Sequence, residues 1–376
     1  MKQQTQPQPY SPQNPPMYTT SDEIDLRVLL KALWNGKLIV ILVTALFTAS
    51  SIGFALLTQE WWSSSAKIAE AQPQDTSSYQ QQVKQFQPVF NIYQDDGTVL
   101  VNKELDSLVD STILFRRFIN TFNSTNNKRE FLDKSPEFSK FKYSALVDAD
   151  GSEISDNAVR VLYMQWFSRI AASVVDEKKA NSSYSISFQT MDKQRSFDLL
   201  TAYISMTESK VHGDAFNNLR AVVNSKRNEL VQQKKILERQ ASNKLLVETE
   251  RAKYAAQIAK SAGVEKPVQT GNEKELFSID LGSKGLDAKV KALKSVKNLS
   301  VIEPRLQQIN AKLDMLNNLK IDRTVDFQTF RYLENVEQPI TRDKPKRALI
   351  VVLGTLLGGI LGVAIVLIRF AFRKED

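Results

Sequence analysis

Residues 38–57 read LIVILVTALFTASSIGFALL, and residues 348–368 read ALIVVLGTLLGGILGVAIVLI; neither stretch contains a charged residue. At about 1.5 Å rise per residue, each would form a helix of roughly 30 Å, which matches the hydrocarbon thickness of a bilayer. A buried core helix is the alternative, but core helices of this length usually keep a charged face toward solvent. The two stretches therefore predict a membrane protein with one transmembrane helix near each end of the chain.

A cleaved signal peptide is another interpretation of the first stretch. Its apolar run is too long for a signal peptide and begins only at Leu38. Glu23 and Asp25 also stand where a signal peptide carries basic residues. We therefore expect the first stretch to stay in the mature protein as a transmembrane helix.

Basic residues favour an orientation with both termini in the cytoplasm. They precede the first stretch and follow the second, at Arg27, Lys31, Lys37, Arg369, Arg373 and Lys374. Another basic group lies directly before the second stretch and argues against this orientation: Arg342, Lys344, Lys346 and Arg347. Because the first span usually dominates, we expect both termini in the cytoplasm. The central domain would then be extracytoplasmic, and in a Gram-negative cell it would be periplasmic.

Composition excludes most enzyme classes. The chain has 376 residues, a formal net charge of +8, no Cys and one His. These counts exclude disulfides, thiolate metal sites, Cys nucleophiles and multi-histidine metal centres. No phosphate-binding glycine motif is present, and His212 is more readily explained as an incidental residue than as a catalytic one. We expect no catalytic residue, no metal and no cofactor.

The patterning divides the chain into eight segments. Ser63–Glu70 and Ser183–Thr190 have strand patterns, and residues 102–122 and 156–176 are helix candidates, so the region next to the membrane predicts a mixed α/β base. The expected segments are a disordered cytoplasmic tail (1–20), an amphipathic lead-in (21–37), a first span (38–57), the first part of the base (58–191), a helical arm with a return helix (192–320), the rest of the base with a Pro/basic segment (321–347), a second span (348–368) and a cytoplasmic tail (369–376).

The arm, residues 192–320, should be a long helical hairpin. No Pro and only Gly213 interrupt residues 192–262, which would form a helix of roughly 100 Å. A Gly/Pro break at 263–271 precedes a second helical run over 286–320, which is interrupted near Pro304. Both runs carry a narrow apolar stripe, and such a stripe covers one partner helix. The fold class is thus an α+β membrane protein with an arm that stands in solvent or packs beside copies of itself.

The arm is also basic, with ten Lys/Arg against four Glu between residues 220 and 260. One interpretation is a track for an anionic polymer, and the other is an ordinary solvated helix face. The candidate residues of the track are Lys226, Arg227, Lys234, Lys235 and Arg239. Nucleic acid is a poor candidate ligand because no aromatic residues are interleaved with these cations.

The second span contains two overlapping small-xxx-small motifs, GTLLG and GGILG, which allow close helix packing in lipid. The candidate packing residues are Gly354, Gly358, Gly359 and Gly362. Their partner could be the first span, a second copy of the chain or another membrane protein. Glycine is also common in membrane helices for other reasons.

Several motifs occur together in an order that is similar to one known family. They are an acidic EIDL motif and a Trp before the first span, a Trp-led strand after it, the AKSAGVEKP stretch at 259–267, and an FQTFRY segment followed by RDKPKR. The positions that carry the resemblance are Glu23, Asp25, Trp34, Trp62, Phe330, Arg331, Tyr332, Pro339, Arg342 and Pro345. The chain resembles the Wzz-type O-antigen chain-length determinants, the class 1 polysaccharide co-polymerases. Its length and arm-tip sequence are most similar to the very-long-chain, FepE-like subgroup.

This resemblance implies a periplasmic α/β base, a long arm and a homo-oligomeric ring. It implies work beside a Wzy-type polymerase on lipid-linked polysaccharide, and a non-enzymatic role in setting the chain length of lipopolysaccharide O-antigen. The resemblance leaves other functions open: a co-polymerase for capsule, exopolysaccharide or enterobacterial common antigen, and a coiled-coil adaptor of an envelope export system. A transmembrane sensor is the weakest alternative, because the predicted cytoplasmic segments are too short for an output domain.

Overall fold

A computed structural model describes residues 26–94, 96–146, 156–179, 182–268 and 276–373. The chain divides into two compact units. The membrane unit comprises residues 1–62 and 341–376, and the central unit comprises residues 63–340. Each unit is described by itself.

The membrane unit contains three helices: α1 (Leu26–Asn35), α2 (Lys37–Leu57) and α13 (Arg347–Arg373). Both α2 and α13 are long and apolar enough to cross a membrane. They lie side by side, and the hydroxyls of Thr48 and Thr355 are 3.0 Å apart. Large apolar side chains such as Leu46 and Leu356 point away from the pair, as expected of helices that face lipid.

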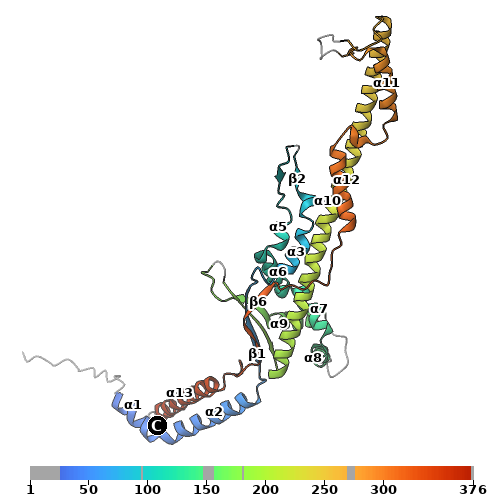
Figure 1. The fold of residues 1–376 in the computed structure, drawn as a ribbon. Coiled ribbons are helices and arrows are strands. Elements are labelled where there is room, and N and C mark those ends of the chain that lie inside the picture. The colour runs from blue at the N-terminus through green and yellow to red at the C-terminus, as the bar shows by residue number, and fades with distance from the viewer. Residues whose placement is uncertain (1–25, 95, 147–155, 180–181, 269–275, 374–376) are drawn as a thin grey trace, which may run out of the picture. The chain divides into compact units, whose positions relative to one another are not determined.

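A four-stranded sheet forms the base of the central unit (Figure 1). Its strand order is β4 (Ile170–Val174), β5 (Tyr184–Thr190), β1 (Trp62–Glu70) and β6 (Phe330–Glu337). β4 pairs antiparallel with β5, with Ile170 opposite Phe188. β1 pairs antiparallel with β6, with Ile68 opposite Tyr332. Strands that are distant in sequence therefore meet, and both ends of the central unit contribute to one sheet.

Short helices and a hairpin surround the sheet and the lower part of the arm. They are α3 (Ser77–Lys84), α4 (Gln87–Phe90), β2 (Ile92–Tyr93), β3 (Val99–Leu100), α5 (Asp106–Val109), α6 (Ser111–Asn123), α7 (Thr125–Lys134), α8 (Pro136–Leu146) and α9 (Asp156–Phe167). Local capping sets several boundaries: the Asp110 carboxylate accepts a hydrogen bond from the Ile113 amide at 3.0 Å, and the Ser124 hydroxyl caps α7 in the same way. Fully buried Phe118 and Phe122 on α6 pack into the core beneath the sheet.

One helix, α10 (Lys193–Ser261), runs for 69 residues from the base to the tip of the arm (Figure 1). The Asp192 carboxylate caps its first turn by accepting from the Arg195 amide at 2.9 Å. Three return elements pack along its distal half: α11 (Gly282–Ser295), the 3₁₀ turn η1 (Leu299–Val301) and α12 (Arg305–Asn318). Two terminal apolar helices, a mixed α/β base and a long helical arm confirm the predicted fold class.

Several predicted elements differ in detail. The candidate helix at 156–176 ends at Phe167 and continues as strand β4, because residues 170–174 complete the edge of the sheet. The candidate at 102–122 is two helices, since Asp110 has extended backbone and starts a new helix as its N-cap. Residues 71–98 contain two helices that the sequence patterns do not predict, α3 and α4, which bury Tyr79, Val89 and Phe90.

The arm tip offers a test of local packing. Gly282 has a φ of +66°, and a Cβ there would lie 2.5 Å from the Lys266 carbonyl oxygen. Gly263 has a φ of +72°, but a Cβ there meets no atom within 4 Å. We expect Gly263→Ala to cost about 1 kcal/mol through backbone strain alone and Gly282→Ala to cost at least about 2 kcal/mol. Hydrogen exchange of tip peptides measures both costs, and equal protection in the two variants would contradict the packing argument.

Candidate functional site

Three of the four candidate glycines lie against α2. A Cβ at Gly358 would lie 2.7 Å from the Phe47 Cβ, and one at Gly362 would lie 2.9 Å from the Val40 Cα. A Cβ at Gly354 would overlap the Ser51 side chain. Gly359 differs, since its nearest neighbour would be the Thr44 hydroxyl at 3.9 Å. The structure therefore places the glycine face of α13 against the first span of the same chain.

An ion-pair cluster lies where α2 ends and α13 begins. The Glu60 carboxylate accepts from Arg342 at 2.7 Å and from Arg347 at 2.8 Å. Arg347 also donates to the Ala55 carbonyl at the end of α2, at 3.1 Å. The Trp61 amide donates to the Lys344 carbonyl at 3.0 Å. The basic residues before the second span thus hold the end of α2 beside the start of α13.

The remaining motif positions have different surroundings. Phe330 is buried in the base core, and Tyr332 packs edge-on against it with ring centroids 5.1 Å apart. Arg331 pairs with Ala69 in the sheet register. Trp34 is exposed, with the Lys37 ammonium 5.1 Å from its ring, while Trp62 and Pro339 are half-buried and Pro345 is buried. Glu23 and Asp25 lie outside the described residues.

The five candidate residues of the anionic-polymer track do not share one face of α10. Lys226 pairs with Glu229 at 2.8 Å, and the Arg227 guanidinium donates to the Leu316 carbonyl at 2.7 Å. Lys234 is half-buried and lies 3.9 Å from Glu238. Lys235 and Arg239 are exposed on a different side of the helix. Lys226 and Arg227 therefore make close intramolecular contacts, and Lys226 also faces a cavity.

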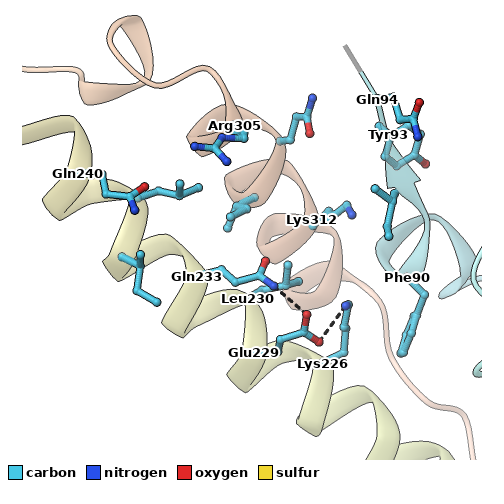
Figure 2. A pocket seen from close by; sticks show the side chains of 15 residues that line it. Phe90, Tyr93, Gln94, Lys226, Glu229, Leu230, Gln233, Gln240, Arg305 and Lys312 are labelled. Atoms are coloured by element: carbon cyan, nitrogen blue, oxygen red, sulfur yellow. Dashed lines mark hydrogen bonds and ion pairs between the residues drawn. The ribbon is translucent and has the colours of Figure 1, made fainter. Parts of the chain in front are cut away.

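This cavity, of about 700 Å³, lies in the central unit where α10, α12 and the α4–β2 segment meet (Figure 2). Apolar side chains and four glutamines line it together with one carboxylate and three cations. The lining residues are Phe90, Ile92, Tyr93, Gln94, Lys226, Glu229, Leu230, Gln233, Ile236, Leu237, Gln240, Arg305, Gln308, Ile309 and Lys312. Its size falls in the roughly 300–1,000 Å³ range of small-molecule sites.

Two lysines and one glutamate define the electrostatics of the cavity. The Glu229 carboxylate accepts from Lys226 and from the Gln233 amide, each at 2.8 Å. Lys312 projects from α12 toward β2 and donates to the Asn91 carbonyl (Figure 2). Burial, and then the positive charge of Lys226, hold the pKa of Lys312 below its ordinary value, while Glu229 opposes the shift. The Glu229 carboxylate thus accepts a hydrogen bond from Lys226 and also acts electrostatically on Lys312.

Sequence reasoning identified only Lys226 among these residues. The spacing of Lys226, Leu230, Gln233 and Leu237 places them on one face of α10, which is a signal that the sequence contains. The residues from α12 and β2 are about 80 and 130 positions away in the chain, and no local pattern pairs them with that face. Among the described residues, no group of three or more potential metal ligands is present.

His212 lies in the interior of the central unit. Its ring stacks on Phe327 with centroids 4.2 Å apart, and its buried Nε2 has no hydrogen-bond partner within the described part of the chain. Burial lowers the pKa of His212, although the Asp326 carboxylate and a hydrogen bond to the Phe327 backbone oppose this. Burial, and then Asp326, raise the pKa of nearby Glu208. The surroundings of His212 indicate a packing role.

These opposite shifts predict an acid-dependent loss of stability through His212. Below its ordinary pKa of about 6.5, the unfolded chain binds a proton that the folded chain does not, so stability falls as pH falls. Glu208 acts in the opposite direction, because its contribution is present at low pH and is lost as pH rises through its raised pKa. Urea midpoints at about pH 7.5 and about pH 5.5 should therefore differ less in His212→Gln than in the wild type. An equal difference in the two proteins would contradict the assignment to His212.

Comparison with known proteins agrees with this architecture. The Wzz family, described as chain length determinant protein, matches residues 22–133, and GNVR, a G-rich domain, matches residues 306–371. The fold is that of a polysaccharide co-polymerase: a solved full-length bacterial polysaccharide co-polymerase is 24% identical, with a TM-score of 0.62 over 94% of this chain and 99% of the other. The wild-type O-antigen chain-length regulator WzzB of Shigella flexneri is 19% identical, with a TM-score of 0.50 over 75% and 100%.

Three curated relatives extend over nearly the whole chain. The ferric enterobactin transport protein FepE of Escherichia coli K12 is 26% identical over 97% of this chain and 94% of its own length. The chain length determinant protein of the same strain is 25% identical over 94% and 95%. The polysaccharide chain length modulation protein for ECA, also of that strain, is 24% identical over 97% and 99%. Residues 22–133 therefore match the model of the Wzz chain length determinant domain, and nearly the whole chain is similar to chain length determinant proteins.

Proposed function

We propose that this protein regulates the chain length of a surface polysaccharide, lipopolysaccharide O-antigen, and does so without catalysis. The observation that carries the proposal is the near-complete overlap with chain length determinants, on a fold with an α/β base and a 69-residue helix between two apolar terminal helices. A helix of this length suits a scaffold better than an active site. The Wzz family groups regulators of polymer length, which also supports a non-enzymatic role.

The proposed location is the bacterial inner membrane. Both termini lie in the cytoplasm, and the central unit lies in the periplasm, where lipid-linked polysaccharide is extended. The basic residues that precede the first span and follow the second support this orientation. The eight segments expected from the sequence follow the same plan.

The proposed partners are further copies of this chain, a Wzy-type polymerase and the lipid-linked polymer. A homo-oligomeric ring is supported by the arm, where exposed apolar residues such as Leu246, Val247 and Tyr254 remain beside the return helices. Packed against neighbouring arms, these side chains would leave water. The ring would hold the polymerase or the growing chain and bias when elongation stops.

Enterobacterial common antigen is a second candidate polymer. The ECA chain length modulation protein covers as much of this chain as FepE does, at 24% against 26% identity. An analysis of both polymers from the same strains therefore decides which of them this protein regulates.

A ladder gel of lipopolysaccharide tests the proposal. The strains are the wild type, a deletion of this chain, and the deletion complemented with it; common antigen from each strain is analysed in parallel. We expect the dominant cluster of long-chain bands to disappear on deletion and to return on complementation. A change confined to common antigen would assign the second candidate. If neither polymer changes, regulation of these polymers is wrong, and an adaptor of an envelope export system becomes the better hypothesis.

A further inference from the structure

The cavity between α10, α12 and the α4–β2 segment has a rim that is apolar on one side. Ile92 and Tyr93 are 57% and 40% exposed where β2 meets the cavity, and Ile236 on α10 is 56% exposed. Large apolar side chains in such positions gain free energy when a ligand with an apolar face covers them. The ring of Tyr93 is therefore partly exposed, with the Lys312 ammonium 5.4 Å from its centroid.

The interior of the cavity carries an excess of positive charge. The Lys226 side chain is only 14% exposed, and the Glu229 carboxylate that pairs with it also accepts from Gln233. Lys312 faces the same space with a backbone carbonyl as its acceptor and lies 5.4 Å from the Tyr93 ring. Arg305, at the outer end, is paired with Glu303 at 2.6 Å. Among the described residues, the inner group of two lysines and one glutamate is thus one negative charge short of neutrality.

Neutral amides complete the lining. Gln94, directly after β2, and Gln233 and Gln240 on α10 line the cavity (Figure 2). Gln308 on α12 lines it as well. A primary amide both donates and accepts hydrogen bonds. Four of them around one space match a ligand with many hydroxyl groups, since each hydroxyl also donates and accepts.

These features together select one ligand class. A pyranose ring has an apolar C–H face, which suits Tyr93, and a rim of hydroxyls, which suits the amides. A single carboxylate neutralises the inner charge and forms charge-assisted hydrogen bonds to lysine. A pyrophosphate group brings more charge and no apolar face, so it fits this lining less well.

We propose that this cavity binds an acidic sugar residue, with the sugar carboxylate between Lys226 and Lys312 and the ring stacked on Tyr93. The proposal deepens the proposed function, because the sugar would belong to the polymer whose length is regulated. It defines a place on the arm where the growing chain is held directly. It also places that contact on one concave surface rather than along the whole basic helix.

Direct binding to the full-length protein in detergent tests the proposal. Calorimetric titration uses tetragalacturonate as the acidic probe, its carboxyl-reduced form as the neutral probe and inorganic pyrophosphate as the anion without a sugar. We expect the acidic probe to bind about tenfold more tightly than either of the others, which is the effect of one charge-assisted hydrogen bond. Lys312→Gln and Tyr93→Ala should each weaken binding by about tenfold.

Lys235→Gln is the matched control, because Lys235 is exposed on the same helix and does not line the cavity. It should leave affinity unchanged, and circular dichroism should show that all variants are folded. The proposal is overturned if the wild type binds no probe, if pyrophosphate binds best, or if Lys235→Gln weakens binding as much as Lys312→Gln. If the deletion strain has a normal ladder and the protein still binds the acidic probe, the proposed function is wrong and the site remains. If the ladder changes on deletion but the protein binds no probe, the proposed function remains and the site is wrong.

Discussion

Tyr203→Ala should destabilise the central unit by about 3–5 kcal/mol, the cost of removing a large buried aromatic ring. Tyr203 is fully buried on α10, and its ring contacts those of Phe122, Phe131 and Phe188 at centroid distances of 4.7, 5.0 and 6.4 Å. These three rings belong to α6, α7 and β5. One side chain therefore fastens the long helix to two helices and the sheet of the base.

The hydroxyl of Tyr203 adds a smaller and separable contribution. It donates to the Phe122 carbonyl at 2.7 Å and accepts from the Asn127 amide at 3.2 Å. Tyr203→Phe keeps the ring and leaves both partners buried without it, so we expect a loss of about 1–2 kcal/mol. Pulse proteolysis of the full-length protein across a urea series measures both variants. If Tyr203→Phe costs as much as Tyr203→Ala, the hydrogen bonds rather than the rings anchor α10.

Long periodic and apolar segments were the part of the fold that sequence reasoning could predict. The expected helix over 192–262 agrees with α10 because its end signals are local: Asp192 caps the start, and Gly263 with positive φ follows the end. The two apolar stretches coincide with α2 and α13 for a similar reason, since length and lack of charge are properties of one segment.

Short elements whose stability comes from distant partners were the part it could not predict. Strand β6 overlaps the FQTFRY motif, and no local pattern predicts it as a strand, because it pairs with β1 some 260 residues earlier in the chain. The end of helix α9 at Phe167 is likewise set by the pairing of β4 with β5 rather than by a local stop signal. Sheet pairing of this kind is non-local, so periodicity within one segment does not reveal it.

At the candidate site, too, local features could be predicted from the sequence and contacts between distant segments could not. The basic character of α10 is visible in the sequence, but the partners of each cation are not. Arg227 reaches a carbonyl at the end of α12, and Lys226 faces the α4–β2 segment. A count of charges along the helix therefore suggests one continuous track, whereas the fold divides the same cations between internal contacts, a cavity and solvent.

Gly358→Leu should disrupt the pairing of α2 and α13, with a cost of about 1–3 kcal/mol or more from overpacking. Its Cβ would lie 3.0 Å from the Thr44 Cα, and the helix backbone there can yield only by moving the helices apart. Gly359→Leu is the matched control, because it adds the same side chain one residue away, where the nearest neighbour is at 3.9 Å.

The absence of native cysteines makes this separation measurable in the membrane. Thr48 and Thr355, whose hydroxyls are 3.0 Å apart, are both replaced by Cys, and oxidation then reports how often α2 and α13 meet at this level. We expect efficient cross-linking in the otherwise native chain and with Gly359→Leu, and a severalfold loss with Gly358→Leu. A monomeric cross-linked product means that the two helices of one chain pair with each other, since a disulfide between copies would appear as a dimer. Equal cross-linking in the two leucine variants would show that the glycine face does not hold the helices together. Loss of cross-linking together with loss of the long-chain bands would mean that chain-length regulation requires close pairing of the two spans.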